Sequence, residues 1–175
     1  MDTLEAIWTR RSVRRYLERP VPEDLLETVL KAGMNAPSAG NEQPWHFIVI
    51  DSKKLFGRIM AAHPYASMME TAPVAIMVCG DTRMEIYPGN WMLDCAAATQ
   101  NMLLAAHAEG LGAVWLGVFP DAERMAAMRG IFDLPADIQA FSIIALGYTE
   151  VPREDAHRFR PERVHHNGWK TGRAY

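Results

Sequence analysis

Short runs of apolar residues recur along the chain and predict the strands of a sheet. Each run is bounded by Gly, Pro or polar residues, a pattern typical of strands that are mostly buried. The predicted strands are Phe47–Ile50, Val74–Cys79, Gly110–Gly117 and Phe141–Leu146.

The segments between these runs carry apolar residues at helical spacing. Pro22 suits the first turn of a helix, and Gly33 is the expected C-cap of the same helix. The pattern predicts helices at Asp2–Trp8, Pro20–Gly33, Ser52–Ala62, Asn90–Glu109 and Asp121–Gly130.

The predicted helix Asn90–Glu109 is the longest, at about 28 Å from the standard rise per residue. Its apolar residues cover more than one stripe, so we expect little of its circumference to be solvated. Such a helix lies at the centre of a core or packs on another subunit. Its many alanines favour the subunit interface, but composition leaves both alternatives open.

Length and composition indicate one domain, which we take to span residues 1–175. With 175 residues, 49% of them hydrophobic, the chain is long enough for a single core. The net charge of -3 argues against nucleic-acid binding, and no apolar run approaches the ~20 residues of a membrane span. The first residues lack the pattern of a signal peptide, so we expect a cytoplasmic protein. The polar residues 153–175 are interpreted as a disordered tail or as an arm ordered on another subunit.

A polar loop from Asn35 to Phe47 separates the second predicted helix from the first predicted strand. Pro37, Gly40 and Pro44 disfavour both an α-helix and a hydrogen-bonded β-strand in this loop. Hydrogen-bonding side chains, which we expect to point out of the loop, are supplied by Ser38, Asn41, Glu42 and Gln43. Such groups suit a flat heterocycle edged by carbonyls and ring nitrogens. The alternative is an ordinary connection whose side chains satisfy their own backbone.

A second candidate lies directly after the first predicted helix, in the basic segment Arg10–Tyr16. Four arginines flank or follow Ser12 there, although the chain as a whole is mildly acidic. Planar guanidinium forks beside a hydroxyl donor suit a phosphate group. The alternative is a solvated, charged face.

The glycines of Gly110–Gly117 do not form a dinucleotide-binding fingerprint, because they follow a helix and open a strand. They are better interpreted as a helix stop and a strand whose backbone approaches a ligand at Gly117. The irregular stretch Asp81–Gly89 is a candidate lid. Cys79 and Cys95 are expected as small core residues, and no zinc site is expected.

Taken together, these motifs resemble those of the FMN-dependent nitroreductase family over nearly the whole chain. The resemblance is carried, in chain order, by Arg10–Arg14, by the Pro-Ser-x-x-Asn-x-Gln-Pro-Trp pattern of Pro37–Trp45, and by Gly110–Gly117. It implies an α+β fold with a central mixed sheet surrounded by helices. It also implies a homodimer with FMN at the subunit interface. The long helix and the C-terminal arm would form this interface.

The resemblance also assigns roles to individual residues. Arg14 would reach the N1 and O2 edge of the flavin, and the backbone of Leu116 and Gly117 would lie near N5. The phosphate would be held by Arg10, Arg11, Ser12 and an arginine of the arm, either Arg158 or Arg160. The ring and the ribityl chain would be lined by Pro37, Ser38, Asn41 and Gln43. A further cation that the family often carries has no clear equivalent between Pro64 and Thr71.

The reaction implied by the resemblance is reduction of a small electron-poor acceptor, such as a nitroaromatic or a quinone, by NADH or NADPH. Hydride would pass through flavin N5 in a ping-pong sequence, and no protein acid or base would be needed. The alternatives are other flavin chemistry on the same fold, namely flavin or ene reduction, dehalogenation or flavin fragmentation, and a non-catalytic FMN-binding protein.

Overall fold

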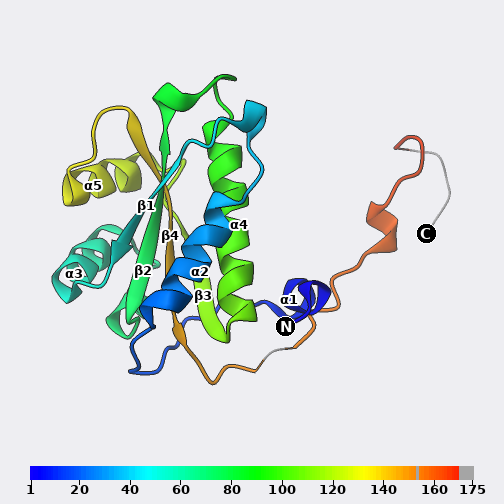
Figure 1. The fold of residues 1–175 in the computed structure, drawn as a ribbon, viewed down its shortest axis with the longest axis horizontal. Helices are drawn as coiled ribbons and strands as arrows, with labels where there is room; N and C mark the ends of the chain where they lie inside the picture. The colour runs from blue at the N-terminus through cyan, green and yellow to red at the C-terminus, as the bar shows by residue number, and fades with distance from the viewer. Residues whose placement is uncertain (153, 170–175) are drawn as a thin grey trace.

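A four-stranded antiparallel sheet lies between two pairs of helices in the computed structural model, which describes residues 1–152 and 154–169 (Figure 1). The strand order is β1-β2-β4-β3, with β2 and β4 in the centre. The strands are β1 (Trp45–Ile50), β2 (Val74–Asp81), β3 (Leu111–Gly117) and β4 (Ile138–Tyr148).

The α+β class is confirmed, and the mixed character of the sheet is limited to one short contact. All pairings between the named strands are antiparallel. The parallel component among the described residues is an isolated bridge between Ser12 and Ala113. The basic segment thus lies beside the free edge of β3 without forming a strand.

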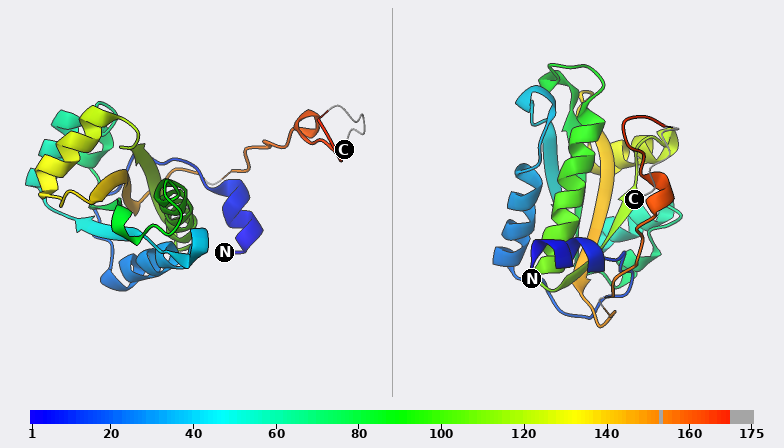
Figure 2. Two further views of the ribbon diagram at one scale, coloured as in Figure 1. Left: turned by 90° about the horizontal axis from the view of Figure 1, so that it is seen from above. Right: turned by 90° about the vertical axis from the view of Figure 1, so that its right-hand side faces the viewer.

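Helices cover both faces of the sheet (Figures 1 and 2). One face carries α2 (Glu23–Met34) and α4 (Trp91–Ala108), and the other carries α3 (Lys53–Ala62) and α5 (Ala122–Phe132). The short helix α1 (Thr3–Thr9) contacts α4. Single turns of 3-10 helix occur at Ala39–Asn41, Ser67–Glu70, Thr82–Met84 and Pro161–Arg163.

The two helical layers create two apolar cores, because successive side chains of a strand point to opposite faces. Met77 of β2 packs with the α3 and α5 side, in a core that includes Phe56 and Met128. Its neighbour Ile76 belongs to the other core, with Val29 of α2 and Met102 of α4. This arrangement explains why β2 is buried along its whole length.

Two local predictions are wrong. The run Phe47–Ile50 was expected to be buried, but β1 is an edge strand, and Val49 keeps 43% of its surface exposed. Gly33 was expected as a C-cap, but it lies inside α2, which is capped by Asn35. A Cβ atom at Gly33 would lie 2.8 Å from Met102 Sδ, so this glycine permits the close approach of α2 to α4.

The long helix α4 packs on α2 and on the sheet, which confirms its place in a core. Its role in a subunit interface stays a prediction. Among the described residues, no helix is both long and apolar enough to cross a membrane.

The C-terminal segment extends away from the body of the protein, past α1 (Figures 1 and 2). Its described part, residues 154–169, is largely exposed, including the aromatic side chains of Phe159 and Trp169. Arg153 and residues 170–175 of the predicted arm lie outside the described residues. The arm's packing on a partner therefore stays a prediction.

The close approach at Gly33 can be tested against a glycine with the same helical setting. Gly57 lies inside α3 with no atom within 4 Å of an added Cβ, so Gly57→Ala gains only helix propensity. Gly33→Ala gains the same propensity but must displace Met102 and Phe47. We expect its free energy of unfolding, from urea titration, to be about 1–3 kcal/mol lower than that of Gly57→Ala. Equal values for the two variants would show that the approach is not tight.

Candidate functional site

The basic segment is fixed to the sheet by two buried residues, Val13 and Tyr16. The Val13 amide donates to the carbonyl of Ala113 at 2.9 Å. The Tyr16 hydroxyl lies 2.7 Å from the carbonyl of Val13 and 2.9 Å from that of Ala145. Because these two side chains point inward, the arginines between and around them point away from the core.

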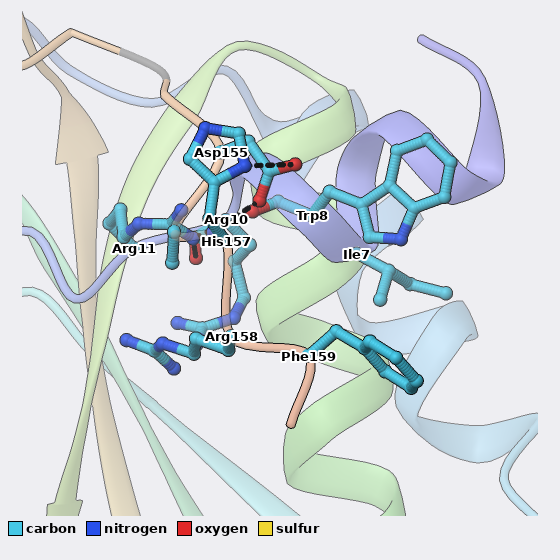
Figure 3. A pocket seen from close by; sticks show the side chains of 9 residues that line it. Ile7, Trp8, Arg10, Arg11, Asp155, His157, Arg158 and Phe159 are labelled. Atoms are coloured by element: carbon cyan, nitrogen blue, oxygen red, sulfur yellow. Dashed lines mark hydrogen bonds and ion pairs between the residues drawn. The ribbon is translucent and has the colours of Figure 1, made fainter. Parts of the chain in front are cut away.

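Three arginines meet at a hollow of about 650 Å³ next to α1 (Figure 3). Arg10 and Arg11 come from the basic segment, and Arg158 comes from the C-terminal segment. Apolar side chains of Ile7, Trp8 and Phe159 form another part of the lining. The structure thus brings Arg158, one of the two candidate arginines of the arm, next to Arg10 and Arg11, which lie almost 150 positions away in the sequence.

The three arginines of this hollow form no ion pair among the described residues, since the one carboxylate in the lining, Asp155, is paired with His157. Arg11 donates to the backbone carbonyls of Trp8, Arg10 and Glu154. Within the described residues, the guanidinium groups of Arg10 and Arg158 have no hydrogen bond or ion pair. Burial lowers the pKa of Arg10, and the charges of Arg11 and Arg158 lower it further. An anion bound between these groups would remove their mutual repulsion.

Three other predicted cofactor-binding residues, Ser12, Arg14 and Arg160, do not line the arginine hollow. Ser12 lies within the basic segment and is exposed. Arg160 donates to the carbonyls of His157 and Phe159 and does not line the hollow. Arg14 lines a separate hollow of about 320 Å³, together with the 3-10 turn at Ser67–Glu70. No motif in the sequence indicates that this turn faces Arg14.

The loop of residues 37–44 has an unusual backbone. Gly40, Asn41 and Gln43 all have positive φ angles, of 55°, 59° and 47°. The Gln43 side chain donates to Asn41 Oδ1 at 2.7 Å, and the Gln43 amide donates to Ser38 Oγ at 3.1 Å. These contacts match the alternative in which the loop satisfies its own groups, although Asn41 and Gln43 remain exposed.

One residue of this loop points the opposite way from the prediction. Glu42 was expected to point outward, but it is only 5% exposed. Its Oε2 atom accepts from the amides of Ile86 and Tyr87, at 2.7 and 3.2 Å. The 37–44 loop is thereby attached to the 85–90 segment, which overlaps the predicted lid Asp81–Gly89.

Gly117 has a firmly held carbonyl and an open face. His63 Nε2 lies 2.9 Å from the Gly117 oxygen, and Arg124 donates to the same oxygen at 3.1 Å. The Tyr65 amide donates to His63 Nδ1, which places the ring proton on Nε2. A Cβ at Gly117 would meet no atom within 4 Å, whereas the Leu116 side chain is buried. Only the backbone of these two residues is thus available to a ligand.

His63 and Arg124 were missed by sequence reasoning. Both come from outside the predicted motifs, on the turn after α3 and on α5. The apolar spacing around them gives no indication of their target, because the contact to Gly117 depends on the packing of both elements against the end of β3.

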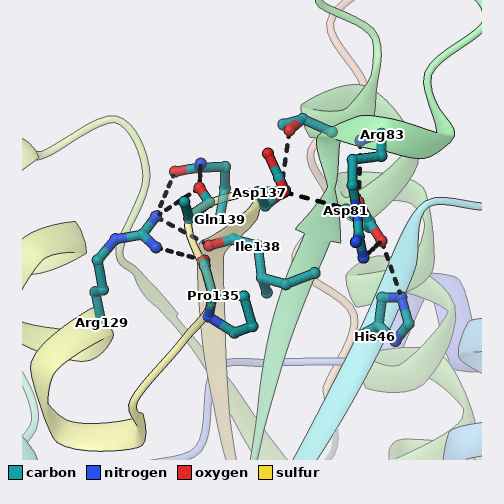
Figure 4. A network of polar contacts seen from close by, with 10 residues as sticks. His46, Asp81, Arg83, Arg129, Pro135, Asp137, Ile138 and Gln139 are labelled. Carbon is teal, nitrogen blue, oxygen red and sulfur yellow. Dashed lines mark hydrogen bonds and ion pairs between the residues drawn. The ribbon is translucent and has the colours of Figure 1, made fainter.

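A polar network holds the same end of the sheet (Figure 4). Arg83 forms a bidentate contact with buried Asp81, and the side-chain hydrogen bond from Arg83 lowers the pKa of Asp81. Arg129 donates to backbone carbonyls between Leu134 and Ile138. The 3-10 turn Thr82–Met84, which precedes the 85–90 segment, is therefore attached to the end of β2.

The two groups of predicted site residues lie at opposite ends of α4. The Ala39 amide donates to Asp94 Oδ1 in its first turn, while Thr9 Oγ1 lies 2.8 Å from His107 Nε2 in its last turn. The helical rise between Asp94 and His107 is about 20 Å. Within one chain, the 37–44 loop and the arginine hollow are therefore far apart.

Comparisons with known proteins identify the family. A family model for the Nitroreductase family matches residues 7–62 and 58–148. A protein of Methanothermobacter thermautotrophicus named "Putative NADH dehydrogenase/NAD(P)H nitroreductase" is 48% identical over 169 residues, covering 97% of this chain and 88% of the relative.

Solved structures agree with this match. A crystal structure of the same name from Parabacteroides distasonis has a TM-score of 0.91 and 40% identity, and covers 95% of this chain and 98% of its own. The crystal structure of a "putative nitroreductase in complex with fmn" from Desulfovibrio desulfuricans has a TM-score of 0.83 and 32% identity, and covers 96% of this chain and 98% of its own. The chain described above therefore belongs to the nitroreductase family.

Proposed function

We propose that this protein is an oxidoreductase that uses FMN to reduce electron-poor acceptors, such as nitroaromatics and quinones, with NADH or NADPH. The observation that carries the proposal is the arginine hollow, where Arg10 and Arg158 have no anionic partner among the described residues. Family membership and the FMN bound to a relative of 32% identity support the choice of ligand.

The donor set fits a flavin mononucleotide. Arg10, Arg11 and Arg158 would hold the phosphate, with the Ser12 hydroxyl beside them. Arg158 is preferred to Arg160, because Arg158 lines the hollow and Arg160 is engaged with backbone carbonyls.

The chain's own residues would orient and polarise the cofactor. When bound, FMN supplies hydride acceptance and donation at N5. Arg14 would place a positive charge at the N1 and O2 edge, where reduction leaves negative charge. The Gly117 peptide, held by His63 and Arg124, would present a fixed, open backbone face to the ring. The nicotinamide nucleotide and the acceptor would then bind in turn at one open site beside the flavin.

The separation of the two groups of site residues favours a homodimer. A second copy would bring its own 37–44 loop, with Pro37, Ser38, Asn41 and Gln43, to the arginine hollow of the first. Exposed apolar side chains near that hollow, on α1 and on the C-terminal segment, would be buried by such a partner; they are Leu4, Ile7, Trp8 and Phe159. In this arrangement residues 1–175 form one domain, and 153–175 are an arm on the partner.

The phosphate role of Arg10 can be separated from the general basicity of its segment. Loss of a charged hydrogen bond costs about 1.5–3 kcal/mol, so Arg10→Ala should weaken FMN binding roughly ten- to over a hundredfold. Arg15→Ala removes the same charge from an exposed residue outside the arginine hollow and should change the dissociation constant much less. Equal losses in fluorescence titrations would show that only net charge matters.

The proposed reaction predicts a visible change under anaerobic conditions. The FMN complex should lose its flavin absorbance when NADH or NADPH is added, and should regain it when a nitroaromatic or a quinone follows. The control is free FMN with the same nucleotides at equal concentration. A protein-bound flavin that keeps its absorbance with both nucleotides would refute the reductase and leave a binding protein.

A further inference from the structure

Two buried carboxyl groups meet where the 37–44 loop, the 85–90 segment and α4 come together. Glu42 is 5% exposed and Asp94 is 4% exposed. Each uses one oxygen to hold backbone amides: Glu42 Oε2 accepts from Ile86 and Tyr87, and Asp94 Oδ1 accepts from Ala39. The other two oxygens, Glu42 Oε1 and Asp94 Oδ2, are buried without a hydrogen-bond partner among the described residues.

A shared proton satisfies both unpartnered oxygens at once. The Glu42 and Asp94 carboxyl groups interact directly. Two buried carboxylates in such an arrangement strongly disfavour two full negative charges, because neither solvent nor a counter-ion among the described residues compensates them. Burial and the neighbouring Glu42 and Glu85 carboxyls raise the pKa of Asp94, against the opposing hydrogen bond from Ala39. A metal ion is a poor alternative, because the described residues contain no cluster of three candidate ligands here.

The other charged and titratable groups around this pair do not replace the proton. Glu85, on the 85–90 segment, is acidic and accepts from the amides of Gly89 and Trp91. Arg83 is engaged with Asp81. Cys95, the next residue of α4, stays a neutral thiol, because burial, Cys79 and Asp94 all raise its pKa.

The carboxyl pair is well placed to hold a strained loop. Asn41 and Gln43, on either side of Glu42, adopt left-handed backbone angles that residues other than glycine rarely adopt. Such a conformation persists only where neighbouring contacts impose it. Glu42 supplies those contacts, since its inward side chain forces its two neighbours to face outward.

We propose that Glu42 and Asp94 share one proton and act as positioning residues, clamping the 37–44 loop to the 85–90 segment and to α4 in the geometry that receives the flavin. The flavin part of this statement rests on the function proposed above. Loss of the proton would set two negative charges against each other and release the loop.

The direction of the pH effect follows from the sign of the shift. A carboxyl with a raised pKa binds its proton more tightly in the folded protein than in the unfolded chain, so its contribution to stability is complete below the ordinary value of 3.8. That contribution is lost as the pH rises through the raised value. Flavin affinity should follow the same course, falling by up to tenfold for each pH unit above it.

The test compares three variants with the wild-type protein between pH 5 and 9, a window that begins just above the ordinary carboxyl value of 3.8. Glu42→Gln keeps an oxygen for the amides of Ile86 and Tyr87, and its own N–H₂ can donate to Asp94 without a shared proton. Glu42→Ala removes the clamp. Glu85→Gln is the matched control, because it makes the same chemical change at a nearby carboxyl group outside the pair, on the 85–90 segment that Glu42 contacts.

FMN dissociation constants are measured at each pH. We expect the wild type and Glu85→Gln to lose at least tenfold in affinity across this range. Glu42→Gln should keep throughout the affinity that the wild type has at the lowest pH of the series, and Glu42→Ala should bind weakly throughout. The proposal is overturned if Glu42→Gln is as pH-dependent as the wild type, if it binds as weakly as Glu42→Ala, or if the wild type shows no fall.

A second measurement on the same full-length proteins separates the clamp from the proposed function. Without added FMN, the urea midpoint of the wild type should fall with rising pH, and that of Glu42→Gln should fall less. If no FMN binding is seen at any pH, the proposed function fails, and the urea series alone decides the clamp. If the urea midpoints of the wild type and Glu42→Gln then change equally with pH, the shared-proton clamp is refuted.

Discussion

The central pair of strands, β2 and β4, is buried on both faces, because α2 and α4 cover one side and α3 and α5 cover the other. Burial of both faces leaves no room for a ligand within the layers. Polar and charged groups that could serve a ligand are therefore confined to the two ends and the edges of the sheet. The basic segment lies beside the β3 edge near the C-terminal end of α4, and the 37–44 loop lies at the opposite end.

Each end of the molecule carries an unfavourable feature that a ligand or a partner would compensate. At one end, Arg10, Arg11 and Arg158 repel one another, and the exposed apolar residues of α1 face solvent. At the other end, a loop with left-handed residues is held by a buried carboxyl pair. Proteins commonly retain such local costs where function requires a fixed geometry.

Much of this could be predicted from the sequence, because the informative signals are local. Apolar periodicity gave the helices and strands, and the order of the Arg-Ser, Pro-Ser and Gly motifs gave the family. What could not be predicted depends on contacts between distant residues. Gly33 was misjudged because its partner Met102 lies on another helix, and Glu42 because its partners Ile86 and Asp94 lie more than forty positions away. His63 and Arg124 meet at Gly117 only after three elements have packed together.

The proposed function requires that the arginine hollow of one copy and the 37–44 loop of another form one site. A mixture of two full-length variants tests this requirement. Arg10→Ala weakens the hollow, and Gly40→Val disrupts a loop position with φ of 55° and a close contact to Tyr87. Random re-pairing in a two-fold dimer leaves about a quarter of all sites with neither change. We expect the re-paired mixture to bind FMN with native affinity at about that fraction of sites, whereas a mixture that binds no better than its parents would contradict the claim.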